Sequence, residues 1–425
     1  TWNHIDGPKT DMGWGINAGV MRDFLIKLKD HWKAPKIYIT ENGSAWPDRI
    51  GADGGVHDPE REAYLMDHLT AAAEALASAG LPPRFETGES SEGVATIIGS
   101  GLGGATTLFE QAAVFAERGA GRISPFLVPA AIGNMASGEV AIHVGAQGPS
   151  FGAVSACATA GHAIGEAYEM IRRGDATAAL AGGTEAALHP VVIAGFNNMR
   201  ALSRSGASLT GGNPAAASRP FDSGRDGFVM AEGAGILLLE RLDVALARGA
   251  TPLAELVGYG ATADALHITL PAPGGSGAVR AARRALAKAG RTGADLDHVN
   301  AHATSTLIGD ISEARALKAL FGEALPRVAV SSTKALTGHG LSLAGAMESA
   351  FCALALREGY LPPTLHHRTL DPACDLDIVP NTGRAQPLQH GLRREVVHVR
   401  VGYERVAQIL GRVRKQMHHE VPAAH

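Results

Sequence analysis

The chain has few cysteines, little excess charge and no long apolar run, and each scarcity excludes a class of protein. Three Cys among 425 residues, scattered and without a CxxC pair, provide neither a disulfide framework nor a zinc motif, and they are typical of the cytoplasm. A net charge of −4 offers no basic surface for nucleic acid. No apolar run approaches the roughly 18 residues of a membrane-spanning helix. A chain of this length is expected to form more than one domain.

From residue 94 onward, apolar strand patterns alternate with helical ones. Strands are predicted at 94–98, 176–180, 236–239, 253–260, 299–301, 328–331, 396–400 and 406–410, and helices at 278–289, 312–321 and 343–356. This order predicts an α/β fold with mostly parallel sheet covered by helices, built as two similar halves. The glycine-rich turn at 99–104 has no acidic residue at a second strand end, so we interpret it as close backbone packing rather than a dinucleotide site.

Cys157 lies where a short β-favouring run, 151–155, meets a helix rich in small residues. A strand, a cysteine and a helix N-terminus together form the geometry of a nucleophile on a sharp turn. The N–H groups and positive dipole end of the helix favour the thiolate. The alternative is a buried Cys acting as a small hydrophobe. This stretch alone leaves both interpretations open.

Two histidines follow predicted strands in loops rich in hydroxyl groups, where open α/β sheets place ligands. His302 precedes Thr304 and Thr306, and His339 ends a run that contains Lys334. A cysteine nucleophile fits acyl transfer through a thioester, and two imidazole N–H groups could stabilise an oxyanion. With 18 His in the chain, chance placement is the competing explanation for each.

Six motifs occur along the chain: SACAT at 155–159, SRPFD at 218–222, RDGF at 225–228, NAHATST at 300–306, STKALTGH at 332–339 and CDLD at 374–377. Their order and spacing resemble those of the β-ketoacyl-acyl carrier protein synthases, above all the elongating type II ketosynthases. The resemblance extends over about residues 71–410. It implies a thiolase-like fold of two duplicated βαβαβ halves, usually a homodimer, that acts on acyl and malonyl groups carried by acyl carrier protein, with no cofactor and no metal.

The resemblance also implies roles for individual residues. Cys157 would accept the acyl chain, and His302 and His339 would promote malonyl decarboxylation. Lys334 would support them electrostatically. The remaining implied site residues are the channel hydroxyls Thr304 and Thr306, the buried acid Glu348, and Val401 and Gly402 of the loop that gates the acyl pocket.

The chain departs from the family pattern at both ends. The family's first strand, Val-Val-Val-Thr-Gly, is missing. The gate loop, Phe-Gly-Phe-Gly-Gly in the family, is matched by VGYER at 401–405, where Glu404 and Arg405 replace glycines. Ala303 replaces a glycine, and Gly340 and Ser342 alter the turn after His339. We expect these changes to impair the scaffold around retained motif residues.

Residues 1–70 contain three further motifs, TDMGW at 10–14, ITENG at 39–43 and VHDPER at 56–61. Through them this segment resembles a fragment of the family 1 glycoside hydrolases, the β-glucosidases. In that family Glu41 would match the nucleophile of a retaining mechanism, which needs a second carboxyl group about 5 Å away. The Asn-Glu-Pro tripeptide that supplies it does not occur in this chain. Glu41 is therefore interpreted as a polar residue at a strand end.

Together these patterns predict a ketosynthase-like chain with a foreign N-terminal segment, from a gene fusion, a mis-called reading frame or a constructed chimera. Three parts are expected: a glycosidase-like fragment at 1–70, a ketosynthase-like N-terminal half with the nucleophile at 71–248, and a C-terminal half with both histidines at 249–425. We expect residues 37–39 to replace the missing first strand, beside the strand at 94–98 or the one before Cys157. Residues 58–78 should form one helix on the ketosynthase-like body. The predicted reaction is decarboxylative condensation; the alternatives are a catalytically impaired thiolase-fold protein and a β-glucosidase fragment.

Overall fold

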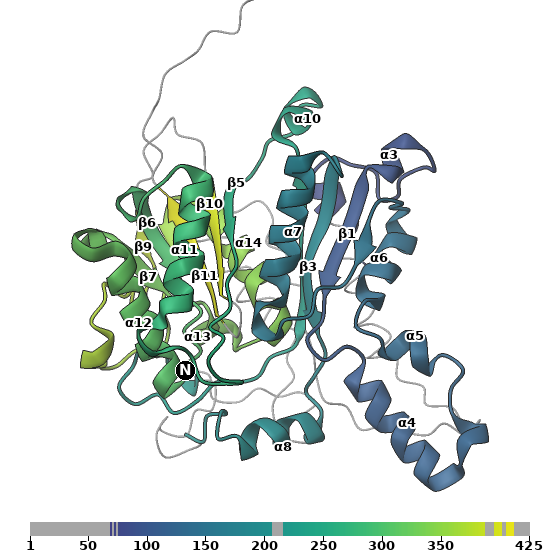
Figure 1. Ribbon diagram of the computed structural model, residues 1–425, viewed down its shortest axis with the longest axis horizontal. Coiled ribbons are helices and arrows are strands. Elements are labelled where there is room, and N and C mark those ends of the chain that lie inside the picture. Colours follow the sequence, from purple (N-terminus) through teal and green to yellow (C-terminus); the bar gives the residue numbers. More distant parts are fainter. Residues whose placement is uncertain are drawn as a thin grey trace, which may run out of the picture.

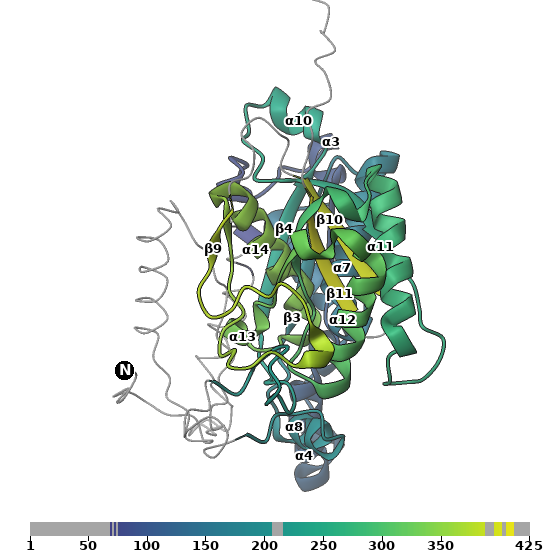
Figure 2. The same cartoon turned by 90° about the vertical axis from the view of Figure 1, so that its left-hand side faces the viewer.

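A computed structural model describes residues 69, 72–73, 75–205 and 216–386, together with the backbone of 395–401 and 405–411. The expected strand at 37–39, and Gly402 and Glu404 of the gate loop, lie outside these residues. The described chain folds into two α/β halves that lie side by side (Figure 1). In Figure 2 the C-terminal half faces the viewer, with the N-terminal half behind it.

The N-terminal half contains a four-stranded sheet in the order β2-β1-β3-β4. Strands β1, β2 and β3 are parallel, and β4 runs antiparallel to β3. The elements of this half are α3 (Glu89–Glu92), β1 (Val94–Gly99), α4 (Ala105–Arg118), α5 (Leu127–Ala131), α6 (Met135–Val144), β2 (Ser150–Phe151), α7 (Thr159–Arg173), β3 (Ala178–Glu185), α8 (Pro190–Asn198), β4 (Gly233–Glu240) and α10 (Leu242–Ala247).

The C-terminal half contains a five-stranded sheet in the order β5-β10-β11-β6-β7, in which β11 is antiparallel to both neighbours. The sheets are therefore mixed rather than mostly parallel as predicted. The elements are β5 (Glu255–Gly260), α11 (Ser276–Ala289), β6 (Leu296–Asn300), α12 (Leu307–Phe321), β7 (Ala329–Ser331), α13 (Lys334–Thr337), α14 (Ala344–Glu358), β8 (Tyr360–Leu361), β9 (Arg384–Ala385), β10 (Glu395–Val401) and β11 (Arg405–Gly411). The predicted boundary at 248/249 falls between α10 and β5.

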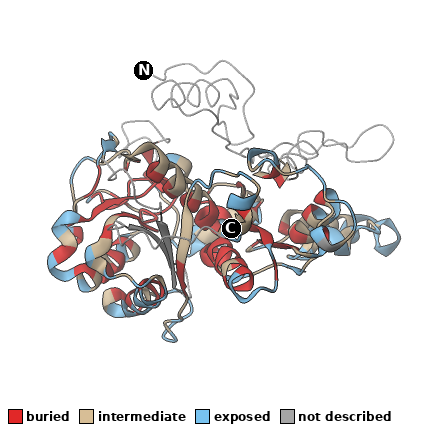
Figure 3. Cartoon of the chain, turned by 90° about the horizontal axis from the view of Figure 1, so that it is seen from above, coloured by how far each residue is buried: buried red, intermediate tan, exposed pale blue. Residues whose placement is uncertain are grey.

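Helices α7 and α14 pack against each other and contact strands of both sheets. Their inner faces are built from small residues, which allow close approach. At Gly165 of α7 an added Cβ would lie 2.1 Å from the ring of Tyr259 in β5, so any larger residue would push the halves apart. Figure 3 shows buried residues concentrated along the sheets and on inward helix faces.

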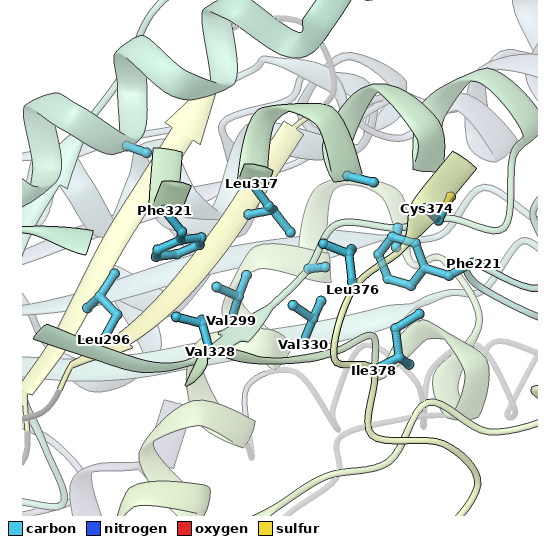
Figure 4. Close-up of a cluster of buried hydrophobic side chains, with 14 of the residues drawn as sticks. Phe221, Leu296, Val299, Leu317, Phe321, Val328, Val330, Cys374, Leu376 and Ile378 are labelled. Atoms are coloured by element: carbon cyan, nitrogen blue, oxygen red, sulfur yellow. The ribbon is translucent and has the colours of Figure 1, made fainter. Parts of the chain in front are cut away.

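The core of the C-terminal half lies between its sheet and helices α11 and α12. Figure 4 shows Val299 of β6 and Val330 of β7 pointing into a cluster with Leu317 and Phe321 of α12. Both valines are fully buried. Burying such a side chain contributes roughly 1.5–3 kcal/mol, so this cluster fixes the strands that end at the candidate site.

The glycine-rich turn after β1 makes close backbone contacts, as the sequence predicted. An added Cβ at Gly99 would lie 2.2 Å from the carbonyl oxygen of Ala153, and one at Gly104 would lie 2.1 Å from that of Ala130. These contacts hold the turn against the loop that leads to Cys157.

The predicted helix at 58–78 is described only at 69, 72–73 and 75–78, where the chain is helical. Ala72 and Leu76 are fully buried and pack on Ile98, Val140 and Leu180 of the N-terminal half. Docking of this part of the helix is therefore confirmed. The alternative that places residues 37–39 beside β1 is wrong, because β1 has β2 on one side and β3 on the other. The alternative beside the strand before Cys157 stays a prediction, because residues 37–39 lie outside the described residues. Within the described chain, β2 and β4 each pair with a strand on one side only.

Candidate active site

Cys157 lies in a single helical turn, η2 (Ala156–Ala158), directly before α7. The strand that precedes it is shorter than predicted, because β2 ends at Phe151 and residues 152–155 form an irregular approach. The backbone N–H of Ser155 donates to Oγ1 of Thr159 at 2.9 Å, which ties this approach to the first turn of α7. Cys157 is 8% exposed, so its thiol is nearly covered.

His302 and His339 both meet Cys157, as the sequence predicted. Nε2 of His339 lies 2.9 Å from Sγ of Cys157. The two imidazole rings pack edge to face, nearly perpendicular to each other, with their centroids 5.2 Å apart. One ligand atom from each of the three residues lies within 4.8 Å of those of the other two, and all three residues are buried. A thiol and two imidazoles therefore share one small volume between the two halves.

The backbone N–H of each histidine donates a hydrogen bond to an acceptor in another part of the chain. The N–H of His339 donates to the carbonyl oxygen of Val229 at 2.7 Å. The N–H groups of His302 and Ala303 donate to the two carboxyl oxygens of Glu313, at 2.9 and 2.7 Å. Sequence reasoning missed Glu313; the available signal was an acidic residue on the buried face of α12, which a core helix does not carry without a partner.

Lys334 and Glu348 form a fully buried ion pair beside the histidines. Burial raises the pKa of Glu348 to about 7, partly offset by the Lys334 ammonium. Burial, with a smaller contribution from the same ammonium, lowers the pKa of His339 well below its ordinary value. His339 is therefore a neutral imidazole at physiological pH, able to donate one N–H.

Three residues without glycine's freedom have positive φ angles at this site. They are Ala156 (51°), Ser305 (69°) and Leu341 (52°). Ala156 precedes the nucleophile, Ser305 separates Thr304 from Thr306, and Leu341 follows His339 by two positions. Such conformations cost about 1–3 kcal/mol each and cluster at functional sites. The surrounding packing therefore holds the local backbone of all three motifs.

Two of the substitutions expected to impair the scaffold fit it without strain. Ala303 is buried, does not have a positive φ, and accepts a 2.9 Å hydrogen bond from Ser332 Oγ at its carbonyl oxygen. Ser342 is buried and its Oγ donates to the carbonyl oxygen of Thr184 at 2.5 Å. At these two positions the local geometry accommodates the substituted residue, while Leu341 in the same turn as Ser342 has a positive φ.

The remaining predicted residues border this group. Thr304 is buried and Thr306 half-buried, with their hydroxyl oxygens 3.2 Å apart. Val401 ends β10, where it pairs with Arg405 at the start of β11, and β11 contacts η2. An apolar cluster that sequence reasoning missed also contacts Cys157; it includes Phe228, whose ring lies edge-on to His339 at 5.4 Å.

His298 in β6 gives the fold a testable pH dependence. It is fully buried, with Nε2 2.6 Å from Ser331 Oγ. Burial, helped by the positive charge of Arg384, lowers the pKa of His298 to about 3. A histidine in the unfolded chain titrates near 6.5, so between pH 6.5 and 3 the unfolded state binds more protons. The contribution of His298 to the free energy of unfolding is therefore fully present above pH 6.5, and it falls as the pH drops from 6.5 towards 3.

We expect H298Q, which keeps a side chain able to form a hydrogen bond with Ser331, to reduce this acid sensitivity. The slope of the unfolding free energy against pH, from urea titrations between pH 6.5 and 4.5, should become shallower by up to about 1.4 kcal/mol per pH unit, the equivalent of one proton. Replacing the exposed His143 by Ala is the matched control and should leave the slope unchanged. An unaltered slope in H298Q contradicts the assignment.

Comparison with known proteins agrees with this geometry. Residues 59–245 match the family "Beta-ketoacyl synthase, N-terminal domain", and residues 253–368 match "Beta-ketoacyl synthase, C-terminal domain". Residues 2–82 match "Glycosyl hydrolase family 1". A 3-oxoacyl-[acyl-carrier-protein] synthase 2 of Staphylococcus aureus is 47% identical over 330 residues, which cover 76% of this chain and 80% of that protein.

Solved structures show the same fold. One contains a type II PKS acyl-carrier protein in complex with its ketosynthase bound to the hexaketide; it matches at 33% identity with a TM-score of 0.74, covering 84% of this chain and 86% of that one. A beta-ketoacyl synthase from Burkholderia phymatum matches at 32% identity with a TM-score of 0.72, covering 82% of each chain. The predicted thiolase-like fold is confirmed, and the chain belongs to the β-ketoacyl synthase family.

Proposed function

We propose that this ketosynthase condenses an acyl thioester with a malonyl thioester, both carried by acyl carrier protein, in fatty acid or polyketide synthesis. The observation that carries the proposal is the meeting of a cysteine on a helix-terminal turn with two imidazoles, one of them 2.9 Å from the sulfur. The names of relatives and structural neighbours support the carrier-protein substrates.

In the first half-reaction the thiolate of Cys157 attacks the thioester carbonyl. A carbon–sulfur bond to Cys157 forms, and the bond to the carrier thiol breaks, so the carrier leaves as a free thiol after taking up the proton. Buried apolar side chains beside the sulfur, including Phe228 and Met230, provide a dry environment for the bound acyl group.

In the second half-reaction the malonyl carbon–carboxylate bond breaks and CO2 leaves. The bonding electrons form an enolate, whose oxygen would receive N–H hydrogen bonds from His302 and His339. Its carbon then attacks the acyl group, and the Cys157 thiolate departs. The imidazole N–H groups suit this step, because they donate hydrogen bonds to the negative charge that develops on the enolate oxygen. Burial holds the pKa of His339 in the range that keeps it neutral.

The two threonines and the gate complete the proposed substrate contacts. Thr304 and Thr306 present adjacent hydroxyl groups next to His302, suited to the amide groups of the phosphopantetheine arm. Val401, at the end of the hairpin strand β10, would offer backbone groups to the acyl carbonyl. These assignments follow the resemblance and the proximity of β11 to η2.

The test is an assay with acyl- and malonyl-acyl carrier protein in which CO2 and the 3-oxoacyl product are measured separately. We expect both, in equal amounts. Release of CO2 without product would support the alternative of an impaired thiolase-fold protein. Hydrolysis of a β-glucoside without either product would support the glycosidase alternative, which the missing second carboxyl group disfavours.

The gate substitutions give a separate prediction. Glu404 and Arg405 occupy positions where flexible glycine backbone is expected, so the loop should be stiffer. We expect condensation below that of a family member with the intact loop, and recovery of turnover in the double variant E404G/R405G. Equal turnover before and after both substitutions would count against this explanation.

We also infer a homodimer in the cytoplasm. The strand β2 pairs with β1 on one side only within the described chain, and the side chains of Phe151 in β2 and of Val154, three residues after it, are exposed. Edge strands with such surroundings favour pairing with a second chain. None of the three cysteines, all within the described residues, forms a disulfide bond, which is consistent with a reducing compartment. No helix in the described part of the chain is long and apolar enough to cross a membrane. Light scattering would give the mass in solution, expected near twice 43.9 kDa.

A further inference from the structure

The side chains of the candidate site are also of the types that bind transition metals, a property that does not depend on their roles in condensation. Cys157, His302 and His339 supply one sulfur and two imidazole nitrogens within 4.8 Å of one another, all buried. In a tetrahedral zinc site, bond lengths of about 2.3 Å to sulfur and 2.0–2.1 Å to nitrogen place ligand atoms roughly 3.3–3.6 Å apart. The observed separations, from 2.9 Å to at most 4.8 Å, bracket this range.

We propose that Cys157, His302 and His339 form an inhibitory Zn²⁺ site. A thiolate with two imidazoles is a donor set that suits zinc and does not suit Mg²⁺ or Ca²⁺, which prefer oxygen ligands. Three protein ligands leave the fourth position open to water or to an incoming thiol. When Zn²⁺ binds, the zinc–sulfur bond forms as the Cys157 thiol gives its proton to the buffer, and the sulfur is no longer available to attack a thioester.

One buried charge near the site opposes a cation, the Lys334 ammonium that contributes to the lowered pKa of His339, and its opposition is reduced by a carboxyl partner. The nearest buried ammonium, Lys334, is paired with the carboxyl group of Glu348. On the other side, the carboxyl group of Glu313 lies against the backbone N–H of His302. The backbone hydrogen bonds on both histidine segments hold the two rings near the sulfur without a metal. Zinc would therefore bind to a largely formed site.

The binding test uses ZnCl2 and a chromogenic zinc chelator as competitor, with the purified full-length protein in thiol-free buffer. We expect one tight site in the wild type and a loss of affinity of at least about 100-fold in C157A and in H302A. The exposed His143 gives the matched control: H143A should bind as the wild type does. Magnesium chloride should not displace zinc. Because metal binding is measured directly, its failure is distinct from failure of the condensation proposal.

A second measurement avoids variants altogether. Iodoacetamide should alkylate Cys157 in the wild-type protein, and the modified peptide can be quantified by mass spectrometry. We expect equimolar ZnCl2 to suppress this alkylation and a chelator to restore it. Equal zinc affinity in wild type and C157A, or alkylation of Cys157 unaffected by bound zinc, would overturn the proposal, since either result would place the metal on other residues.

Discussion

Replacement of Cys157 by Ala should reduce condensation by at least about 10³-fold, while malonyl decarboxylation continues. The sulfur is the only proposed acyl acceptor, so its loss removes the covalent intermediate. The imidazoles of His302 and His339 remain, and decarboxylation needs only their N–H groups. The measurement is CO2 release and 3-oxoacyl product formation from the same reaction.

The histidines provide the matching comparison. H302A and H339A should lose decarboxylation, because each removes a donor to the enolate oxygen, and removal of one such donor costs about 10²–10³-fold in rate. If C157A lost decarboxylation as completely as H339A does, the assignment of separate roles to the sulfur and the imidazoles would be wrong.

Replacement of Lys334 by Met should destabilise the fold by about 3–5 kcal/mol, since it leaves the buried carboxyl group of Glu348 without its partner. The double variant K334M/E348L removes both charges and should regain most of that stability. Urea denaturation of the two variants and the wild type measures the difference. Equal stability of K334M and the double variant would show that the pair is not coupled.

The destabilisation caused by K334M should depend on pH. Burial already raises the pKa of Glu348 to about 7, above the value near 4.5 of an unfolded chain. Between these values the folded state binds more protons, so the contribution of this group to the unfolding free energy falls as pH rises through the window. Without the ammonium the carboxyl group takes up a proton more readily. The difference between wild type and K334M should therefore be larger at pH 8 than at pH 5.

The sequence predicted the site better than it predicted the sheets. Cys157, His302 and His339 each stand at a strand-to-helix transition within a recognisable motif, and transitions of this kind meet at one end of an α/β sheet. Most predicted strands are present, because runs such as 94–98 and 328–331 are apolar and bounded by polar turns. The antiparallel direction of β4 and β11 could not be predicted, since an apolar run carries no sign of its direction.

Other features depended on contacts between distant parts of the chain. Glu313 is recognisable as the hydrogen-bond acceptor for the backbone N–H of His302 only once α12 is packed beside that segment. Ala303 and Ser342 were expected to disturb their turns, and only the observed φ angles and hydrogen bonds show that they fit. One of the two places expected for the missing strand is excluded: β1 is flanked on both sides, a consequence of sheet order rather than of local sequence.

The most direct test of the account is the location of the acyl group after the first half-reaction. The protein is incubated with an acyl-acyl carrier protein in the absence of malonyl substrate, digested at mildly acidic pH, and its peptides are analysed by mass spectrometry. The account predicts one acyl group per active chain, on Cys157 as a thioester that hydroxylamine removes. The buried Cys352 and Cys374 should remain free, because burial raises the pKa of both thiols. An unmodified Cys157, or an acyl group on either of the other cysteines, would contradict it.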